Sequence, residues 1–345
     1  MAYTTIDNPA LHFNAVTWTG TGDATTTVSG VGFQPDWVWI KNRSVGDDHA
    51  LFDAVRGVEK ILFSNATNAE STNTESLTAF NADGFVTGNH RATGGDSGNG
   101  MVSWNWLGAN GTASNSDGSI TSTVSANTTA GFSIVRYTGT GSNATVGHGL
   151  GVAPNVYIVK SLSGGGDWTS YHSVLGNTKF LRLNSTIAAG TQSSYWNDTS
   201  PTSTVFSLGT AGDTNTNSGT HVAYCFADKK GYSKFGSYTG NGNAEGPFVY
   251  TGFKPAFVIA KISSDANDWF MFDNKRSTFN PMDDSLYPNT SAVENTNHII
   301  DFLSNGFKIR DSDGTVNSTG NTYIYMAFAE NPFVTVGTKA AGTAR

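Results

Sequence analysis

The residues best suited to chemistry are two acid–arginine pairs with the same spacing. Asp53 and Arg56 lie in "FDAVR", and Asp273 and Arg276 lie in "FDNKR". An aspartate three residues before an arginine can contact a ligand, or it can form a local ion pair that fixes a turn. Hydrolysis of a glycosidic bond requires two positioned carboxylates, and no such pair recurs along this chain. We therefore predict turn-fixing pairs, keep ligand contact as the alternative, and predict no catalytic residue.

Three ring-bearing residues form a second candidate set. His49, Trp168 and Trp269 each directly follow an aspartate. Indole rings can stack on sugars, but aromatic residues at repeated positions are more often buried. We predict burial for the two tryptophans and keep a carbohydrate platform as the alternative. The candidate ligand-binding residues are His49, Trp168, Trp269, Asp53, Arg56, Asp273 and Arg276, and a recognition surface is expected in the loops around the first three.

Two short motifs carry weaker signals. "GDSG" (95–98) resembles the nucleophile loop of trypsin-like serine proteases, but Asn99 follows and no segment supplies the base that Ser97 would need. We predict a glycine-rich hairpin there. "RDSDG" (310–314) resembles a calcium loop with Asp311 and Asp313 as weak candidates, but its glycine stands too early and no glutamate closes it. We predict no metal site and no cofactor, because no phosphate-binding glycine motif precedes a helix.

These residues recur because the sequence repeats itself. "WTGTG" (18–22), "YTGTG" (137–141) and "YTGNG" (238–242) each begin 17 residues before a proline, namely Pro35, Pro154 or Pro255. An apolar run ending in lysine follows each proline: "DWVWIK", "NVYIVK" and "AFVIAK". The spacing predicts an N-terminal arm at 1–13, units at 14–109, 131–236 and 237–333, a polar linker at 110–130 and a tail at 334–345.

The elements that must position the candidate residues are predicted to be strands. Each proline should begin a strand, because proline cannot donate a ladder hydrogen bond, and the apolar run after it should be buried on both faces. Residues 49–65 have roughly helical apolar spacing, but their counterparts in the other units do not, so we predict strand–turn–strand. The fold class is all-β: three repeated antiparallel β-sandwich-like units of about 100 residues, with little helix.

The stretch "DWVWIKNRS" (36–44) is rich in aromatic and basic residues, and comparison of the three copies indicates whether it is a binding surface or a buried strand. Trp37 and Trp39 are replaced by aliphatic or phenyl side chains in the other copies, which favours a core role. The lysine recurs as Lys41, Lys160 and Lys261, and we expect it where the strand emerges into solvent or meets a neighbouring unit.

Composition excludes several classes of protein. Charged residues are 14% and the net charge is −7, with no Lys/Arg-rich run, so a nucleic-acid partner is not expected. No apolar stretch approaches a membrane span and the N-terminus lacks a secretory signal, so membrane insertion is not expected either. The single Cys225 excludes an internal disulfide and is predicted to be an inert buried thiol. We expect folding in a reducing cytoplasm.

Nearly the whole chain resembles structural proteins of marine tailed bacteriophages, described as tail-fibre-like or virion surface proteins. The resemblance lies in "MAYTTIDNP", "GFQPDWVWIKNRS", "HALFDAVRG", "TAGFSIVRYTGTG", "YSKFGSYTGNG" and "YIYMAFAENPF". It implies localisation in the virion after assembly in the host bacterial cytoplasm. It also implies partners among other virion proteins, capsid or tail, and self-association as a homotrimer. The arm at 1–13 is then a candidate attachment segment.

Three functions follow as expectations. The first is a non-enzymatic virion protein on the particle exterior, a tail-fibre-like appendage or host-recognition protein that binds a host-surface glycan or protein. The second is a head-decoration protein that stabilises the capsid, which the lack of any heptad run or long shaft favours over an extended fibre. The third is a polysaccharide-degrading tail enzyme, which the scarcity of paired carboxylates disfavours.

Overall fold

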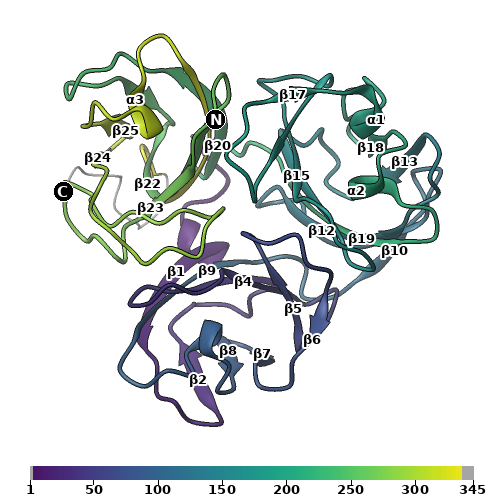
Figure 1. The fold of residues 1–345 in the computed structure, drawn as a ribbon, viewed down its shortest axis with the longest axis horizontal. Coiled ribbons are helices and arrows are strands. Elements are labelled where there is room, and N and C mark those ends of the chain that lie inside the picture. The colour runs from purple at the N-terminus through teal and green to yellow at the C-terminus, as the bar shows by residue number, and fades with distance from the viewer. Residues whose placement is uncertain (1–2, 336–345) are drawn as a thin grey trace.

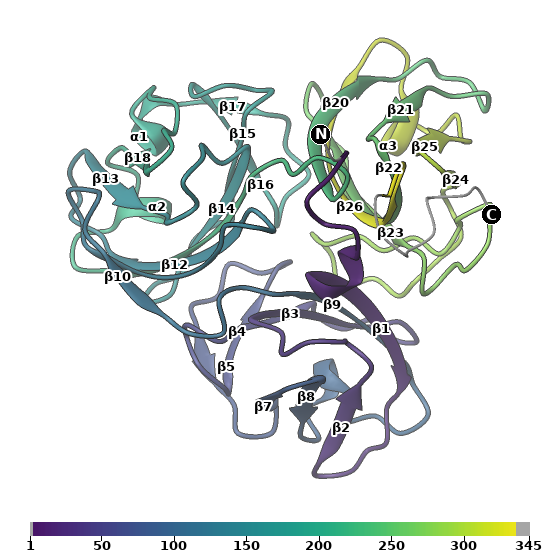
Figure 2. The same cartoon turned by 180° about the vertical axis from the view of Figure 1, so that it is seen from behind.

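The computed structural model describes residues 3–335 and is all-β, with its strands in antiparallel sheets. Three lobes surround a common centre, each with one large and one small sheet (Figure 1). The same ring is visible from behind (Figure 2). The predicted all-β class is confirmed, and helices are limited to single turns.

Lobe 1 contains strands β1 to β9. Its large sheet has the order β1 (Phe13–Thr19), β9 (Gly100–Trp106), β3 (Trp37–Asn42), β4 (Ala50–Asp53), β5 (Lys60–Phe63) and β6 (Ser71–Thr72). Its small sheet has the order β2 (Thr26–Ser29), β8 (Gly84–Thr87) and β7 (Leu77–Asn81). The 3₁₀ turn η2 (Arg91–Thr93) precedes β9. Residues 49–65 are therefore strand–turn–strand, as predicted.

Lobe 2 contains strands β10 to β19. Its large sheet has the order β10 (Ala113–Asn115), β11 (Ser122–Asn127), β12 (Phe132–Thr138), β19 (Thr220–Phe226), β14 (Val156–Ser161), β15 (Thr169–His172), β16 (Lys179–Arg182) and β17 (Gly190–Thr191). The small sheet pairs β13 (Ala144–Gly147) with β18 (Val205–Leu208), and the one-turn helices α1 (Ser193–Trp196) and α2 (Gly212–Asn215) flank it in sequence.

Lobe 3 contains strands β20 to β26. Its large sheet has the order β20 (Ser233–Thr239), β26 (Thr322–Pro332), β22 (Phe253–Ile262) and β23 (Trp269–Asp273). Its small sheet has the order β21 (Phe248–Tyr250), β25 (Gly306–Ile309) and β24 (Ile300–Leu303), and helix α3 (Gly314–Asn317) precedes β26. The four central strands have the same order in all three lobes.

Three predicted boundaries need correction. The linker at 110–130 is not a free spacer, because β10 and β11 extend the edge of the lobe 2 sheet and Val124 is buried. Residues 233–236 belong to lobe 3, because β20 pairs with β26. Pro255 lies inside β22 at a register shift, where a proline is tolerated, rather than at the start of the strand. Most of the predicted tail at 334–345 lies outside the described residues.

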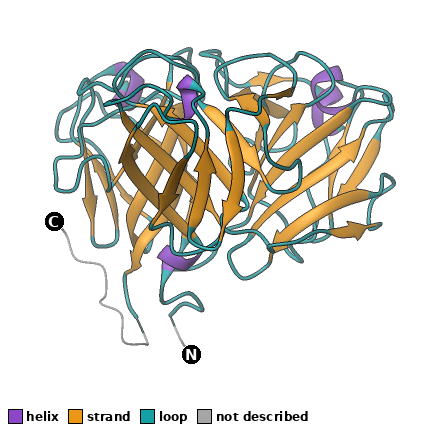
Figure 3. Ribbon diagram, turned by 90° about the horizontal axis from the view of Figure 1, so that it is seen from below, coloured by secondary structure: helices purple, strands orange, loops and turns teal. Residues whose placement is uncertain are grey.

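The predicted arm at 1–13 is packed against the ring in the part that the structure describes. Ile6 is buried in the central core, and Tyr3 donates a hydrogen bond from its hydroxyl to the carbonyl of Gly252 in lobe 3 at 2.7 Å. The 3₁₀ turn η1 (Pro9–Leu11) then leads into β1. Figure 3 shows this segment at one end of the ring, whereas the other short helices gather at the opposite end. Lobes 1 and 3 are thereby joined at that end.

The large sheets are buried on both faces, which explains their apolar runs. In β3 the side chains of Val38 and Ile40 enter the sandwich core of lobe 1, whereas those of Trp37 and Trp39 point to the centre of the ring. This alternation recurs in the other lobes. The sandwich core predicted for each unit therefore exists, and a fourth core lies between the lobes.

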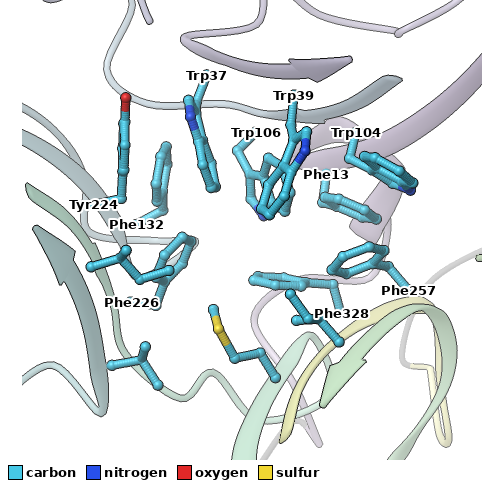
Figure 4. Close-up of a cluster of buried hydrophobic side chains, with 14 of the residues drawn as sticks. Phe13, Trp37, Trp39, Trp104, Trp106, Phe132, Tyr224, Phe226, Phe257 and Phe328 are labelled. Carbon is cyan, nitrogen blue, oxygen red and sulfur yellow. The ribbon is translucent and has the colours of Figure 1, made fainter. Parts of the chain in front are cut away.

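The fourth core, here called the central cluster, is rich in aromatic side chains (Figure 4). Trp37 of lobe 1 stacks on Tyr224 of lobe 2 with ring centroids 4.4 Å apart, and Phe13 stacks on Phe328 of lobe 3 at 5.2 Å. Large aromatic side chains bury about 150–250 Å² each, so this cluster supplies much of the apolar contact between lobes. Its labelled members are Phe13, Trp37, Trp39, Trp104, Trp106, Phe132, Tyr224, Phe226, Phe257 and Phe328.

Candidate functional site

The predicted ligand-binding residues all lie in the interfaces between lobes. In each lobe a loop that we call the strap follows the fourth central strand and its hairpin partner, and crosses to the next lobe. The straps are residues 63–70, 182–189 and 287–294. Each strap donates one backbone hydrogen bond to the next lobe: Glu70 to Leu162, Ala189 to Ser263, and Glu294 to Arg43. The three lobes therefore close into a ring by three similar exchanges.

Trp168 and Trp269 anchor these straps. The indole N–H of Trp168 donates to the carbonyl of Phe63 at 2.8 Å, and that of Trp269 donates to the carbonyl of Arg182 at 2.9 Å. Both rings are buried, which confirms the predicted burial, and they present no open platform to a sugar. The neighbouring lobe occupies the polar edge of both rings as they lie here.

His49 occupies the corresponding place in lobe 1. It is fully buried and accepts a hydrogen bond at Nδ1 from the indole N–H of Trp39 at 3.0 Å. Burial lowers the pKa of His49 well below its usual value, and the charges of Lys41 and Arg276 act in the same direction. The imidazole is therefore neutral and enclosed, so the loop around it offers no recognition surface through this side chain.

A sequence signal behind this arrangement is an asparagine sixteen to twenty residues after each ring residue. The side chain of Asn65 accepts from the backbone N–H of His49 at 3.0 Å and donates to Asp48 at 2.6 Å. Asn184 and Asn289 make the same two bonds with Asp167–Trp168 and Asp268–Trp269. The aspartate before each ring residue thus orients the asparagine that holds the strap hairpin together.

The acid–arginine pairs form turns, as predicted, and they also clamp neighbouring lobes. Asp53 accepts from the backbone N–H groups of Val55 and Arg56, and its second oxygen binds the Arg56 guanidinium. That same oxygen accepts from the Tyr224 hydroxyl of lobe 2 at 2.7 Å. Burial disfavours the charged guanidinium, but the Asp53 carboxylate raises the pKa of Arg56 above its usual value.

The second pair repeats this geometry between lobes 3 and 1. Asp273 accepts from Arg276 at 2.5 Å and from the indole N–H of Trp104 at 2.9 Å. Glu294 on the strap completes the pair by accepting from Arg276 at 2.9 Å, as Glu70 does for Arg56 at 3.1 Å. Burial opposes ionisation, yet the adjacent guanidinium lowers the pKa of Asp273 overall. Each of these four side chains is buried and bonded within the interface, and their alternative role as ligand contacts stays a prediction.

Lobe 2 lacks the acid–arginine pair, and the neighbouring lobe 3 lacks the hydrogen-bond donor that would face it. Its equivalent residues are His172, Leu175 and Ala189, which face lobe 3. The lobe 3 position that matches the donors Trp104 and Tyr224 is Met326, which cannot donate a hydrogen bond. His172 instead lies with Nε2 3.3 Å from the carbonyl of Tyr325. The aspartate, the arginine and the strap glutamate are therefore all absent from lobe 2, where the facing residue of lobe 3 offers no hydrogen-bond donor.

Three buried lysines complete the interfaces. Lys41, Lys160 and Lys261 are fully buried, so the expectation of a lysine emerging into solvent is wrong, and the alternative of contact with a neighbouring unit is correct for two of them. Lys160 donates to the carbonyl of Thr67 on the lobe 1 strap at 2.9 Å, and Lys41 donates to that of Ser291 on the lobe 3 strap at 3.4 Å. Burial lowers the pKa of each lysine to about 8.

The remaining predicted positions have local structural roles. Asp313 caps α3 by accepting from the N–H of Thr315 at 2.7 Å, and Asp311 lies 3.3 Å from His298. Within residues 3–335 no group of three or more His, Cys, Asp or Glu side chains is placed to hold a metal ion. Cys225 is buried, as predicted, and burial raises the pKa of its thiol. None of the helices described is long and apolar enough to cross a membrane.

Exposed aromatic residues distinguish lobe 3, a feature that the sequence analysis missed. Among the described residues, the exposed large aromatic side chains are Phe248, Tyr250, Phe279 and Phe333, all in lobe 3 or directly after its last strand. Phe248 and Tyr250 lie on β21, an edge strand. Monomeric proteins rarely expose such groups together without a binding role. The signal in sequence was the pair of aromatics in "PFVYTG", where the strand registers of lobe 1 give "TTVSGV".

These observations define a class of protein: an all-β chain of three sandwich lobes closed into a ring by straps, with the exposed large aromatic side chains of its described part in or next to lobe 3. The chain belongs to the family described as a domain of unknown function, DUF7483, whose model matches residues 8–332. Comparison with curated proteins gives no match.

Proposed function

We propose that this chain is a non-enzymatic structural protein on the exterior of a bacteriophage virion, a tail-fibre-like appendage or host-recognition protein. The observation that carries the proposal is the combination of a closed, buried scaffold with exposed aromatic residues that, among those described, lie in or next to one lobe only. Recognition residues are commonly presented by surface segments on a rigid scaffold. The resemblance of the repeated motifs to phage virion surface proteins supplies the location.

The non-enzymatic part rests on where the reactive side chains lie. The acid–arginine pairs, His172 and two of the three buried lysines hold lobes together, and each has a protein partner. Incubation of the purified protein with host envelope polysaccharide is expected to release no oligosaccharide. Release that depends on a carboxylate of this chain would overturn this part of the proposal.

Head decoration is the second candidate function, and the compact ring favours it over a long fibre. Gold-labelled antibody against this chain, applied to purified particles, distinguishes the two. Label at the tail tip or on tail appendages is expected, label over the capsid establishes decoration instead, and absence of the chain from purified particles rejects both. The predicted homotrimer is tested on the same protein by light scattering, where a mass near that of one chain would reject it.

A further inference from the structure

A hollow of about 560 Å³ lies between the N-terminal segment and the start of lobe 3. Its walls come from the segment before β1, the turn that leads into β20, and the edge strand β21. The residues that give it chemical character are Tyr3, Asp228, Lys230, Lys234, Tyr250 and Gly252. None of them belongs to the strap interfaces described above.

One wall of the hollow is formed by two tyrosines. The ring of Tyr250 is 57% exposed, so most of it is available to a ligand. Tyr3 is held beside it by the hydrogen bond to the Gly252 carbonyl. Burial and the neighbouring Tyr250 hydroxyl together raise the pKa of Tyr3 to about 12. Gly252 has a positive φ of 83°, and a Cβ there would lie 2.8 Å from the Tyr3 oxygen, so this close arrangement requires glycine.

The other wall is basic, although the chain is acidic overall. The segment "DKKGYSK" (228–234) contains three lysines and one aspartate, in a chain of net charge −7. Lys234 is paired with Asp228 at 2.5 Å. Lys230 has no carboxylate partner among the described residues, and its ammonium lies 4.5 Å from the centre of the Tyr3 ring. An ammonium without a carboxylate partner in the described part of the chain, lining the same hollow as the exposed Tyr250, complements a ligand that carries both an anion and an apolar face.

Comparison of the lobes shows that the hollow is specific to lobe 3. The strand registers place Ser29 and Gly147 at the position of Tyr250. The same comparison of the first strands places Ala10 and Thr129 at the position of Lys230. Small or neutral side chains therefore satisfy the fold at both positions, so the fold itself does not require tyrosine and lysine there.

We propose that this hollow binds a saccharide bearing a carboxylate or sulfate group. A sugar ring has an apolar C–H face that matches the exposed ring of Tyr250, and a hydroxyl rim that matches the two phenol groups. Its anionic group binds Lys230. The hollow is open to solvent, and its lining mixes aromatic with polar groups, which distinguishes it from a pocket for an apolar ligand. This inference rests on the host-recognition branch of the proposed function and names its ligand class.

The test measures binding of defined oligosaccharides to the full chain by calorimetry at low salt. The probes are oligomers of mannuronate, which carry carboxylates, heparin oligosaccharides, which carry sulfates, and neutral dextran oligomers. At least one anionic probe is expected to bind and dextran is not. Tyr250→Ser and Lys230→Ala, which install the lobe 1 residues, are each expected to weaken binding about tenfold or more. Raising the salt concentration is expected to weaken it further.

The matched control is Phe279→Ser, which removes a still more exposed aromatic residue of lobe 3 that does not line the hollow. It is expected to leave binding unchanged, and thermal unfolding checks that all variants fold. Lack of binding by both anionic probes at millimolar concentration, or binding that survives both substitutions, would overturn the proposal. Equal binding of a polyglutamate peptide would assign the hollow to an acidic protein instead. Particle labelling is a separate measurement, so either proposal can fail alone.

Discussion

At the scale of single residues, the interfaces between lobes are decided by matched donors and acceptors. Asp53 and Asp273 each face a donor from the next lobe, Tyr224 or Trp104, and each is neutralised by an arginine. Where the facing residue is Met326, the carboxylate is absent. A buried carboxylate is stable only when its charge and lone pairs have partners, which explains why acid and donor change together.

Removing one member of such a pair is expected to be severe. Arg276→Leu leaves the Asp273 carboxylate buried without its cation, and loss of one partner of a buried pair costs about 3–5 kcal/mol. Chemical unfolding monitored by fluorescence gives this value. The double variant Asp273→Asn/Arg276→Leu is expected to be more stable than Arg276→Leu alone, because asparagine carries no charge yet still accepts from Trp104. Lys275→Leu, an exposed neighbour, serves as the control, and equal losses in all three variants would refute the argument.

The buried lysines are expected to make stability rise with pH. Their pKa is about 8 in the fold against 10.5 in the unfolded chain. Between these values the unfolded chain binds more protons than the folded chain, so the free energy of unfolding increases as the pH rises. Urea midpoints measured from pH 7.5 to 9.5 are expected to show a smaller upward slope in Lys41→Met than in the exposed control Lys275→Met. An unchanged slope in Lys41→Met would show that its ammonium is not suppressed.

At the scale of elements, the strap is the device that joins lobes. Each strap begins at a β-hairpin held by an asparagine and ends in a backbone hydrogen bond to the next sheet. The tryptophan of the receiving lobe holds the first residue of two of the straps through an indole N–H. Backbone groups enclosed in this way must be paired, because an unpaired buried carbonyl is destabilising.

Loss of one indole hydrogen bond tests the strap directly. Trp168→Phe keeps an aromatic ring but leaves the Phe63 carbonyl without its donor, and we expect a loss of about 1–3 kcal/mol beyond the change in volume. Trp106→Phe is the matched control, because that indole is also buried but its N–H has no partner in the described part of the chain. The free energy of unfolding is measured for both variants under the same conditions. A larger loss of stability in Trp106→Phe than in Trp168→Phe would contradict the role assigned to the strap hydrogen bond.

Strands could be predicted from the sequence better than their partners. The run "DWVWIK" predicts a strand buried on both faces. Successive side chains of a strand point to opposite faces of the sheet, and here the side chains on both faces are apolar and must be covered. It does not say that one face covers another lobe, since a core within a sandwich and a core between sandwiches select the same residue types. The linker was misjudged because Ile120 and Val124, its few apolar residues, are too sparse to display a strand period. The hollow of lobe 3 was missed because its residues are 225 or more positions from Tyr3.

At the scale of the whole molecule, the central cluster makes the three lobes interdependent. Each large sheet presents aromatic rings to the centre, so a lobe on its own would expose them to water. The N-terminal segment adds Ile6 and Phe13 to the same cluster and connects lobe 3 to lobe 1. The ring is therefore a single folding unit in energetic terms, although each lobe has its own sandwich core.

Cooperative unfolding is the expected consequence. Trp37→Ala creates a cavity at the centre and is expected to cost about 3–5 kcal/mol, with all three lobes losing stability together. Hydrogen exchange measured lobe by lobe checks this, because amides of β12 and β26 should lose protection as strongly as those of β3. Ala substitution at Phe85, which lies only in the lobe 1 sandwich core, is the comparison. Loss of protection confined to lobe 1 in Trp37→Ala would show that the lobes unfold independently.

The restriction of the tyrosine–lysine hollow to lobe 3 determines valency. Three lobes related by similar strand order would offer three equal sites if their surfaces were alike, but in the described part of the chain the pair Tyr250 and Lys230 occurs in lobe 3 alone. If the proposed site binds a saccharide, one open site gives weak attachment, and firm adhesion then depends on how many copies of the chain are displayed and how closely they are spaced. Copy number, rather than the affinity of one ring, is therefore the quantity through which such a protein would control the strength of attachment.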